Sequence, residues 1–211
     1  LDLASARESY QGKGLDALQM AANWWEQLDL WLDEAADSGL AEPSAMVLAT
    51  VSPSGVPATR TVLCKGLDRS GAVFFTNRQG RKGRHLAANP RAAATFSWVG
   101  LARQVTLIGS TQPVGDTESD EYFASRPRGS QLGAWASHQS EVIASRDVMV
   151  RQMAAAEERF GNREVERPGH WGGYRLRPVQ IEFWHGRPNR LHDRLRYVNA
   201  QGSWKIQRLS A

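Results

Sequence analysis

Short apolar segments separated by turn residues run through most of this chain, and they restrict its fold more than any other feature. Such segments, bounded by Gly, Pro, Asn and Asp, are typical of β-strands. The predicted strands cover residues 45–51, 58–65, 72–76, 92–98, 103–109, 174–178, 180–184, 190–198 and 203–209. Because short turns such as Pro53-Ser54-Gly55 join many of them, we expect an antiparallel barrel with peripheral helices, a mainly β fold of the α+β class.

Helical patterns occupy the stretches between the predicted strands. Between residues 23 and 37, Leu28, Trp31, Leu32 and Ala35 form one apolar stripe, and Gly39 stands where a helix C-terminal cap belongs. Further helices are predicted after the basic turn at 77–85, over 117–124, and from the N-cap Ser145 to Phe160. The polar stretch 125–140 is expected to lie outside the packing core, and 161–173 is expected to be a loop.

Composition favours one domain that binds small anions. The 211 residues are 41% apolar and include eight Trp, so we expect a single domain over residues 23–211, preceded by an arm at 1–22. Basic residues exceed acidic ones by only 26 to 22, a net charge of +4. A nucleic-acid-binding barrel would interleave aromatic and basic side chains on exposed strands, whereas the Trp residues here lie beside apolar or Gly-rich runs.

Other cellular roles find little support in the sequence. Cys64 is the only cysteine, which excludes an internal disulfide and favours a reducing cytoplasm. The Cys and His spacing predicts no metal site, and no apolar run approaches the length of a membrane span. The start of the chain lacks a signal-peptide pattern, and because it begins at Leu1 we expect that a few residues precede it.

A basic, glycine-containing turn follows the predicted strand 72–76. Residues 77–85, Asn-Arg-Gln-Gly-Arg-Lys-Gly-Arg-His, lead into a short helix that ends before Asn89-Pro90. Free backbone N–H groups and the positive end of a helix would add to the charges of Arg81 and Lys82, so the turn can cradle a phosphate. A solvated basic turn is the alternative, and the spacing fits neither a Walker loop nor a dinucleotide fingerprint.

Basic residues also gather near the C-terminus and elsewhere. On an extended strand, Arg190, His192 and Arg194 would leave from one face, either as an anion-binding row or as an exposed strand face. Arg60 and Lys65 lie five residues apart on a strand and would point to opposite faces. Together with Arg81 and Lys82, and with Arg126 and Arg128, these groups suit two phosphorylated small molecules.

The chain resembles the FMN-dependent pyridoxine/pyridoxamine 5′-phosphate oxidases over nearly its whole length. The resemblance rests on Arg7-Glu8-Ser9-Tyr10, Arg60-Thr61-Val62-Leu63-Cys64-Lys65, Phe75-Thr76-Asn77, Arg81-Lys82, Arg103-Gln104-Val105, the run 122–131, the run 133–137, Gln139-Ser140, Trp171-Gly172-Gly173, Glu182-Phe183-Trp184 and the run 190–194. It implies a split β-barrel and a homodimer with FMN at the subunit interface. It also implies oxidation of pyridoxine or pyridoxamine 5′-phosphate by O2 to pyridoxal 5′-phosphate, with release of H2O2 and, from the amine, NH3.

Site residues follow from the same resemblance. FMN would be bound by Arg60, Thr61, Val62, Leu63, Cys64, Lys65, Phe75, Thr76, Arg81, Lys82, Gln104, Gln139, Ser140, Trp184 and Arg194. The substrate would be bound by Lys65, Tyr122, Arg126 and Ser130 at its phosphate, by the catalytic Arg190 and His192 at its ring, and by Arg7 and Tyr10 in a lid. No metal is implied.

Two departures from the family pattern and two alternative functions accompany this prediction. Phe75 stands where the family often has Tyr, and Gly80 replaces a Ser that would offer the phosphate one more hydroxyl. The related phenazine-biosynthesis flavin oxidases share the barrel, but the intact substrate-phosphate residues favour a phosphorylated vitamin. A carrier of FMN or of the vitamer would not need the catalytic Arg190.

Overall fold

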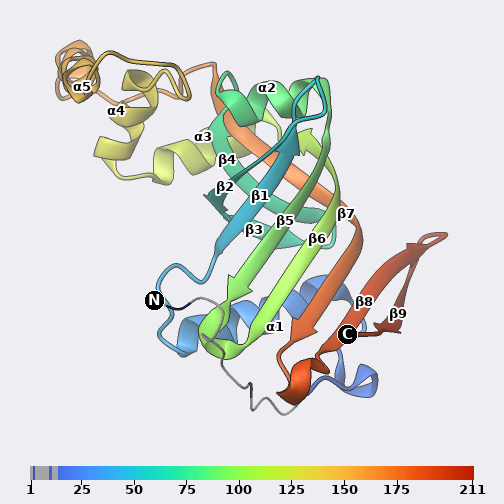
Figure 1. Ribbon diagram of the computed structural model, residues 1–211. Coiled ribbons are helices and arrows are strands. Elements are labelled where there is room, and N and C mark those ends of the chain that lie inside the picture. The colour runs from blue at the N-terminus through green and yellow to red at the C-terminus, as the bar shows by residue number, and fades with distance from the viewer. Residues whose placement is uncertain (1, 3–9, 11–13) are drawn as a thin grey trace.

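A twisted antiparallel sheet forms the body of the molecule (Figure 1). The computed structural model describes residues 2, 10 and 14–211. The strands are β1 (Ala45–Val51), β2 (Pro57–Leu63), β3 (Gly66–Asp68), β4 (Gly71–Asn77), β5 (Arg91–Trp98), β6 (Arg103–Pro113), β7 (Trp171–His185), β8 (Asp193–Ala200) and β9 (Ser203–Leu209). Their order is β2-β1-β5-β6-β7-β4-β3, with β8 paired to β7 and β9 paired to β8. The predicted antiparallel split barrel is thereby confirmed.

Strand β7 gives the barrel its split, because two different strands share one of its edges. Its residues 171–176 pair with β4, whereas its residues 180–185 pair with β8. The other edge pairs with β6. The sequence predicted a loop through residue 173 and two strands, 174–178 and 180–184. The predicted loop is wrong at its last three residues, because residues 171–185 form one continuous strand of 15 residues. As a result, the two halves of β7 belong to different ends of the molecule (Figure 1).

A β-bulge lies between Ile108 and Gly109, where β6 shifts its register against β7. A β-carbon at Gly109 would lie 2.0 Å from the carbonyl oxygen of Arg177, closer than non-bonded atoms approach. Glycine is therefore required for the two backbones to pass each other at this point.

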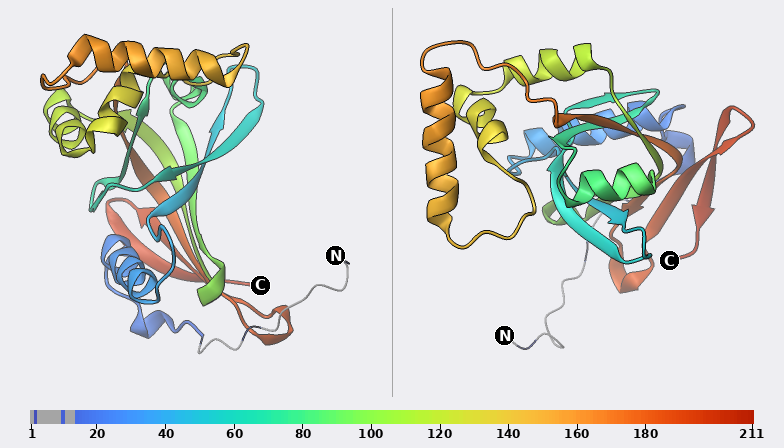
Figure 2. Two further views of the ribbon diagram at one scale, coloured as in Figure 1. Left: turned by 90° about the vertical axis from the view of Figure 1, so that its left-hand side faces the viewer. Right: turned by 90° about the horizontal axis from the view of Figure 1, so that it is seen from above.

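The helices gather at the two ends of the sheet, as Figures 1 and 2 show. They are α1 (Trp24–Asp37), α2 (Arg81–Ala88), α3 (Asp116–Ser125), α4 (Arg128–Ala136) and α5 (Arg146–Phe160), with 3₁₀ turns η1 (Ala17–Gln19), η2 (Val99–Leu101) and η3 (Pro188–Arg190). Helix α1 lies at one end, and α2 to α5 lie at the other. The predicted helix over 23–37 is confirmed, with Leu28, Trp31 and Ala35 buried and Gly39 at a positive φ of 77° just beyond its end.

Two apolar clusters hold these elements together. The main core joins α1 to the inner face of the sheet, and its fully buried side chains include Trp24, Phe74, Phe96, Phe183 and Tyr197. Leu15 and Met20, within the predicted arm, also pack against this core. A second, smaller cluster joins α3, α4, α5 and the start of β7 through Phe123, Leu132, Phe160 and Trp171.

Helix α4 was not predicted, and it corrects the expectation that 125–140 lies outside the packing core. Leu132 is only 5% exposed and belongs to the second apolar cluster. Two glycines, Gly129 and Gly133, conceal the helical pattern in the sequence. Ser145 does occupy the N-cap position of α5, but its side chain makes no capping hydrogen bond.

The predicted strand 190–198 begins later than expected, at Asp193. Pro188 opens the 3₁₀ turn η3, and Asn189 and Arg190 have positive φ values of 57° and 64°, which no strand contains. The expectation that Arg190, His192 and Arg194 leave from one strand face is therefore wrong, because only Arg194 lies in a strand.

Candidate functional site

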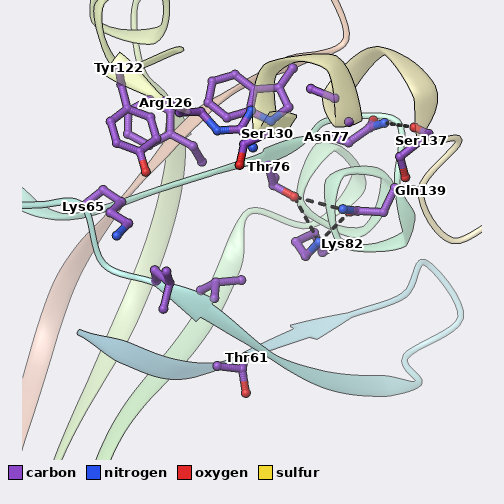
Figure 3. Close-up of a pocket in the computed structure, with 16 residues that line it drawn as sticks. Thr61, Lys65, Thr76, Asn77, Lys82, Tyr122, Arg126, Ser130, Ser137 and Gln139 are labelled. Atoms are coloured by element: carbon purple, nitrogen blue, oxygen red, sulfur yellow. Dashed lines mark hydrogen bonds between the residues drawn. The ribbon is translucent and has the colours of Figure 1, made fainter. Parts of the chain in front are cut away.

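A cavity of about 460 Å³ opens where β2 and β4 face α2, α3 and α4 (Figure 3). The predicted site residues that line it are Thr61, Val62, Leu63, Lys65, Phe75, Thr76, Lys82, Tyr122, Arg126, Ser130 and Gln139. The structure therefore brings together most of the residues for which the resemblance implied contact with FMN or with the substrate phosphate.

Five lining residues were given no role by the sequence: Asn77, Gly133, Ala134, Ser137 and Trp171. Asn77 shapes the basic turn, because its Oδ1 accepts hydrogen bonds from the backbone N–H groups of Gln79 (2.8 Å) and Gly80 (3.2 Å). This Asx-type turn ends β4 and starts α2, so that Lys82 lies in the first helical turn. The sequence signal that could have identified Asn77 is an Asn that follows a predicted strand and stands shortly before a glycine, Gly80.

Lys82 occupies the center of one group of cavity residues. Its Nζ donates to Gln139 Oε1 at 2.6 Å and to Thr76 Oγ1 at 3.0 Å (Figure 3). Burial lowers the pKa of Lys82 to about 8, and the positive charges of Arg60 and Arg81 add to this effect. Three cations that destabilise one another in this way form a site that favours an anion.

Arg60 belongs to the same cationic group as Lys82, whereas Lys65 lines the other side of the cavity. The predicted strand 58–65 ends at Leu63, so Lys65 lies beyond β2 and does not share a strand with Arg60. Its NH1 donates to the carbonyl oxygen of Leu48 at 3.0 Å and to Thr50 Oγ1 at 2.7 Å. Its NH2 is buried and has no hydrogen-bond partner among the described residues. Burial lowers the pKa of Arg60, and the charge of Arg81 lowers it further.

The remaining predicted phosphate ligands of this group lie at the N-terminus of α2. The backbone N–H of Arg81, the first residue of the helix, donates to Ser140 Oγ at 3.2 Å. A β-carbon at Gly80 would lie 2.6 Å from Gln139 Oε1. The absence of a side chain at Gly80 thus lets Gln139 approach Lys82, which gives the departure from the family's Ser a structural consequence.

A second group of polar residues lines the other side of the cavity, where Lys65, Tyr122, Arg126 and Ser130 come together (Figure 3). The guanidinium of Arg126 lies over the ring of Trp171, 4.8 Å from its centroid. Its NH1 is buried and finds no hydrogen-bond partner in the part of the chain that the structure describes. Burial lowers the pKa of Arg126 and raises the pKa of Tyr122.

Stacked aromatic rings form the wall behind this second group. The ring centroid of Phe75 lies 4.0 Å from that of Tyr122 and 5.5 Å from that of Trp171, the latter two lie 6.1 Å apart, and all three rings are nearly parallel. The Phe that replaces the family's Tyr therefore serves as a packing residue that fixes the position of Tyr122.

Arg128 does not join this site, although the sequence grouped it with Arg126. It points away and donates to the carbonyl oxygens of Gly161 (2.5 Å) and Arg163 (2.8 Å). Cys64 also lies outside the cavity lining, because its side chain is buried in the main core and contacts the carbonyl oxygen of Gly66 at 3.3 Å. Burial raises the pKa of this thiol.

Most of the other predicted site residues form a separate cluster where β6 begins and β7 ends, beside η3. The ring centroids of Trp184 and His192 lie 4.7 Å apart, and the ring centroid of Tyr10 lies 5.8 Å from that of Trp184 and 5.9 Å from that of His192. Gln104 is paired with Trp184 across the strands. His192 Nδ1 accepts the backbone N–H of Arg187, which fixes the ring. Arg7, the remaining predicted lid residue, lies outside the described residues.

Arg190 and Arg194 complete this second cluster in different ways. Arg190 is exposed at the end of η3. Arg194 forms a two-pronged ion pair with Glu182 at 2.8 and 3.1 Å, which raises the pKa of the guanidinium.

The two clusters cannot reach one small molecule within a single chain. Trp171 lines the cavity and Trp184 lies in the second cluster, so 13 residues of β7 separate them. At about 3.3 Å per residue, this corresponds to on the order of 40 Å of strand. Figure 1 likewise shows the helices of the cavity and turn η3 at opposite ends of the sheet.

Two other kinds of site find no support in the described part of the chain. Residues 2, 10 and 14–211 contain no group of three or more His, Cys, Asp or Glu side chains arranged to hold a metal ion. Among the helices described there, none is long and apolar enough to cross a membrane.

Comparisons with known proteins agree with this geometry. Residues 32–160 match the family described as Pyridoxamine 5′-phosphate oxidase, and residues 171–211 match the Pyridoxine 5′-phosphate oxidase C-terminal dimerisation region. The latter segment includes β7, β8 and β9.

Among curated relatives, two proteins named pyridoxine/pyridoxamine 5′-phosphate oxidase are 52% identical to this chain. The one from Cupriavidus pinatubonensis aligns over 99% of this chain and 98% of its own length, and the one from Rubrobacter xylanophilus over 99% and 96%. Among solved structures, PhzG from Burkholderia lata 383, in complex with tetrahydrophenazine-1-carboxylic acid, has a TM-score of 0.88 at 28% identity over 94% of this chain and 98% of that one. A pyridoxamine 5′-phosphate oxidase-related, FMN-binding protein from Nostoc punctiforme has the same fold, with a TM-score of 0.71 at 19% identity over 91% of this chain and 100% of its own. The matched segments, the full-length relatives and the cavity residues all lead to one conclusion: this chain belongs to the pyridoxamine 5′-phosphate oxidase family.

Proposed function

We propose that this protein oxidises pyridoxine 5′-phosphate and pyridoxamine 5′-phosphate to pyridoxal 5′-phosphate, using bound FMN and O2. The observation that carries the proposal is one cavity with cations on two sides. Lys82, whose pKa the nearby charges of Arg60 and Arg81 lower, lines one side, and Lys65 with Arg126 lines the other. A phosphorylated cofactor and a phosphorylated substrate require such a pair of anion sites. The relatives that are 52% identical over nearly their full lengths carry this activity in their names.

FMN fits the first group by an observation that does not depend on resemblance. Arg60 NH2 is buried without a partner among the described residues, and an unpaired N–H of this kind is costly unless a ligand satisfies it. Phosphate oxygens would accept from Arg60, Arg81 and Lys82, and the N-terminus of α2 would add its positive dipole. Thr61, Val62 and Leu63 on β2 would lie along the flavin.

The substrate phosphate fits the second group for a similar reason. Arg126 lines the cavity, and its NH1 is buried and lacks a hydrogen-bond partner in the described chain. Lys65, Tyr122 and Ser130 offer an ammonium and two hydroxyls toward the same space. A clamp at this end would fix the reacting carbon over the flavin and make the reaction nearly unimolecular.

A homodimer would complete each site. Within one chain, Arg190, His192 and Trp184 lie on the order of 40 Å along β7 from the cavity. The match of residues 171–211 to a dimerisation region supports a second copy that brings this cluster to the cavity. The FMN site would then lie at the subunit interface. Arg7 and Tyr10 of the arm would close over the substrate as a lid.

The chemistry divides between the cofactor and the protein. When bound, FMN supplies the redox chemistry: a hydride moves from the substrate's C4′ to the flavin, and two electrons then pass to O2, which is released as H2O2. Arg190 would hold the C4′ substituent and assist loss of its heteroatom proton. His192, fixed through its Nδ1 by the Arg187 N–H, would orient the same substituent. The amine substrate would release NH3 after water adds to the oxidised carbon.

A cytoplasmic location is part of the proposal. It is supported by the chain's single cysteine, Cys64, which is buried and has no second cysteine with which to form an internal disulfide.

The test is an aerobic assay of FMN-loaded protein with each phosphorylated vitamer, in which pyridoxal 5′-phosphate and H2O2 are measured together. Equimolar formation of both products is expected. Unphosphorylated pyridoxine is the matched control and should react far more slowly, because it leaves Lys65 and Arg126 without their anion. If FMN binds but neither phosphorylated vitamer is oxidised, the proposed activity is wrong. Turnover of a reduced phenazine carboxylate instead would support the activity suggested by the similarity to PhzG.

A further inference from the structure

A buried polar chain connects the core of the barrel to the guanidinium of Arg60. Thr50 on β1 accepts a hydrogen bond from Arg60 NH1 at 2.7 Å, and its hydroxyl lies 3.1 Å from His85 Nδ1 on α2. Thr50 is completely buried, and His85 is 9% exposed. Neither residue lines the cavity, and neither was singled out by the sequence.

The direction of these hydrogen bonds follows from their chemistry. An arginine N–H can only donate, so Thr50 Oγ1 is the acceptor from Arg60. The Thr50 hydroxyl has one proton left to donate, and His85 Nδ1 is its available acceptor among the described residues. A buried hydroxyl normally satisfies its donor, so His85 Nδ1 is assigned as the acceptor of the Thr50 hydroxyl.

This polar chain fixes the orientation of the Arg60 guanidinium, whose charge acts on Lys82 in the cavity. Arg60 NH1 uses both of its hydrogens, one on Thr50 Oγ1 and one on the carbonyl oxygen of Leu48. With NH1 held at two points, the guanidinium plane is set. Its NH2 is left buried, unpaired within the described chain and close enough to Lys82 for its charge to lower the Lys82 pKa.

We propose that Thr50 and His85 are positioning residues for cofactor binding, which hold Arg60 NH2 ready to donate to the FMN phosphate. The inference rests on the proposed function, because it takes the Arg60, Arg81 and Lys82 group to be the phosphate site. It adds to that function two residues that contact neither FMN nor substrate. Their effect on binding passes through Arg60 alone.

The test compares FMN with riboflavin, which has the same ring system without the phosphate. Apoprotein is titrated with each flavin, and binding is followed by the loss of flavin fluorescence. Thr50→Val keeps the shape of the side chain and removes the hydroxyl. It is expected to raise the FMN dissociation constant about tenfold and to change the riboflavin constant less than twofold. Thr50→Ser, which keeps the hydroxyl, should retain FMN binding within about threefold.

A double-mutant cycle decides whether the effect passes through Arg60. In an Arg60→Ala background, Thr50→Val should cause no further loss of FMN affinity. A continued tenfold loss in that background would overturn the proposal, as would an equal loss of FMN and riboflavin binding by Thr50→Val. If Thr50→Val does not fold, as judged by circular dichroism, His85→Leu takes its place in the same cycle. His85→Leu should likewise weaken the binding of FMN and not that of riboflavin, but by a smaller factor of about threefold.

The wild-type protein separates failure of this inference from failure of the proposed function. If the wild type binds riboflavin as tightly as FMN, the phosphate site itself is wrong. If the wild type prefers FMN and Thr50→Val retains the full preference, the phosphate site stands and the positioning role of Thr50 is wrong.

Discussion

Lys82 shows at the scale of one residue how this cavity prepares for an anion. Its ammonium keeps two hydrogen bonds, to Gln139 and Thr76, yet burial and two neighbouring arginines disfavour the charge. A buried group in this condition gains more from a phosphate than an exposed lysine would, because the anion reverses the repulsion. Its depressed pKa is therefore consistent with a site that is completed by its ligand.

Binding of FMN should consequently weaken as the pH rises through the pKa of Lys82. The folded apoprotein has a Lys82 pKa of about 8, and a bound phosphate raises it, so binding is strongest when the ammonium is fully protonated, below pH 8. Between pH 7 and pH 9, the FMN dissociation constant should rise about tenfold. Lys82→Arg keeps its charge over this range and should flatten the profile, and riboflavin serves as the control without phosphate. An unchanged slope in Lys82→Arg would assign the pH dependence to another group.

Two arginines that are separated by one residue should behave very differently when removed. Arg126→Ala deletes a buried donor in the cavity and should lower kcat/KM for the phosphorylated vitamers roughly tenfold to hundredfold, mainly through KM, with FMN affinity intact. Arg128→Ala is the matched control, because this side chain binds loop carbonyl groups outside the cavity. It should leave kcat/KM within about twofold and lower the melting temperature. Steady-state kinetics of both variants measures the difference. Equal losses of kcat/KM in the two variants would contradict the role of Arg126 in binding the substrate phosphate.

At the level of the elements, strand β7 joins the two halves of the fold. Its neighbour β6 packs closely against it at the bulge. Opposite Ile108 and Gly109, β7 holds the extra residue of the bulge, and it continues as one strand while its partner on the other edge changes from β4 to β8. Trp171 of the cavity wall and Trp184 of the second cluster therefore lie on the same strand.

Substitution at the bulge should therefore cost stability. Gly109→Ala would place a methyl group 2.0 Å from the Arg177 carbonyl oxygen, so the strands must shift, and we expect a loss of about 2–3 kcal/mol in the free energy of unfolding. Gly129→Ala is the control, because nothing lies within 4 Å of the place that its β-carbon would occupy. Because Gly129 lies in helix α4, this substitution should be neutral or should stabilise by up to about 1 kcal/mol. Urea unfolding of the two variants measures the difference. Equal stability would mean that the backbone at Gly109 relaxes without cost.

Elements with a strong local pattern could be predicted from the sequence, and those set by distant contacts could not. The apolar stripe of α1 and the turn before β9 are local, so their positions were predicted almost to the residue. Helix α4 is weak in local pattern and owes its place to packing of Leu132 in the second cluster. Turn η3 depends on positive φ angles at Asn189 and Arg190. Neither residue type favours a positive φ strongly enough for the turn to be predicted from the sequence.

The candidate site divides in the same way. The chemistry of Lys65, Lys82 and Arg126 could be predicted from motifs along the chain, whereas the grouping of Arg60 with Lys82 required the third dimension. The contact between Thr50 and His85 spans 35 residues and two elements, and neither residue carries a sequence signal of its own.

For the whole molecule, the proposed function implies that a single chain carries two halves of different sites. One half is the cavity with Arg126, and the other is the cluster with Trp184, Arg190 and His192 at the far end of β7. A twofold dimer would pair each half with its complement in the partner and would form two equivalent sites. Loss of either half in both chains would then disable both sites.

Complementation between two defective subunits tests this arrangement directly. Arg126→Ala damages the cavity half and Arg190→Ala damages the other half, so homodimers of either variant contain no intact site. In a heterodimer of the two variants, one site carries both substitutions and the other carries neither, because each site draws its halves from different chains. Co-expression with two different affinity tags and purification through both should give dimers with about half of the wild-type kcat/KM per dimer. If each chain instead held a complete site, every site in the heterodimer would carry one defect. The kcat/KM would then be no higher than the mean of the two defective homodimers, and the shared-site dimer would be excluded.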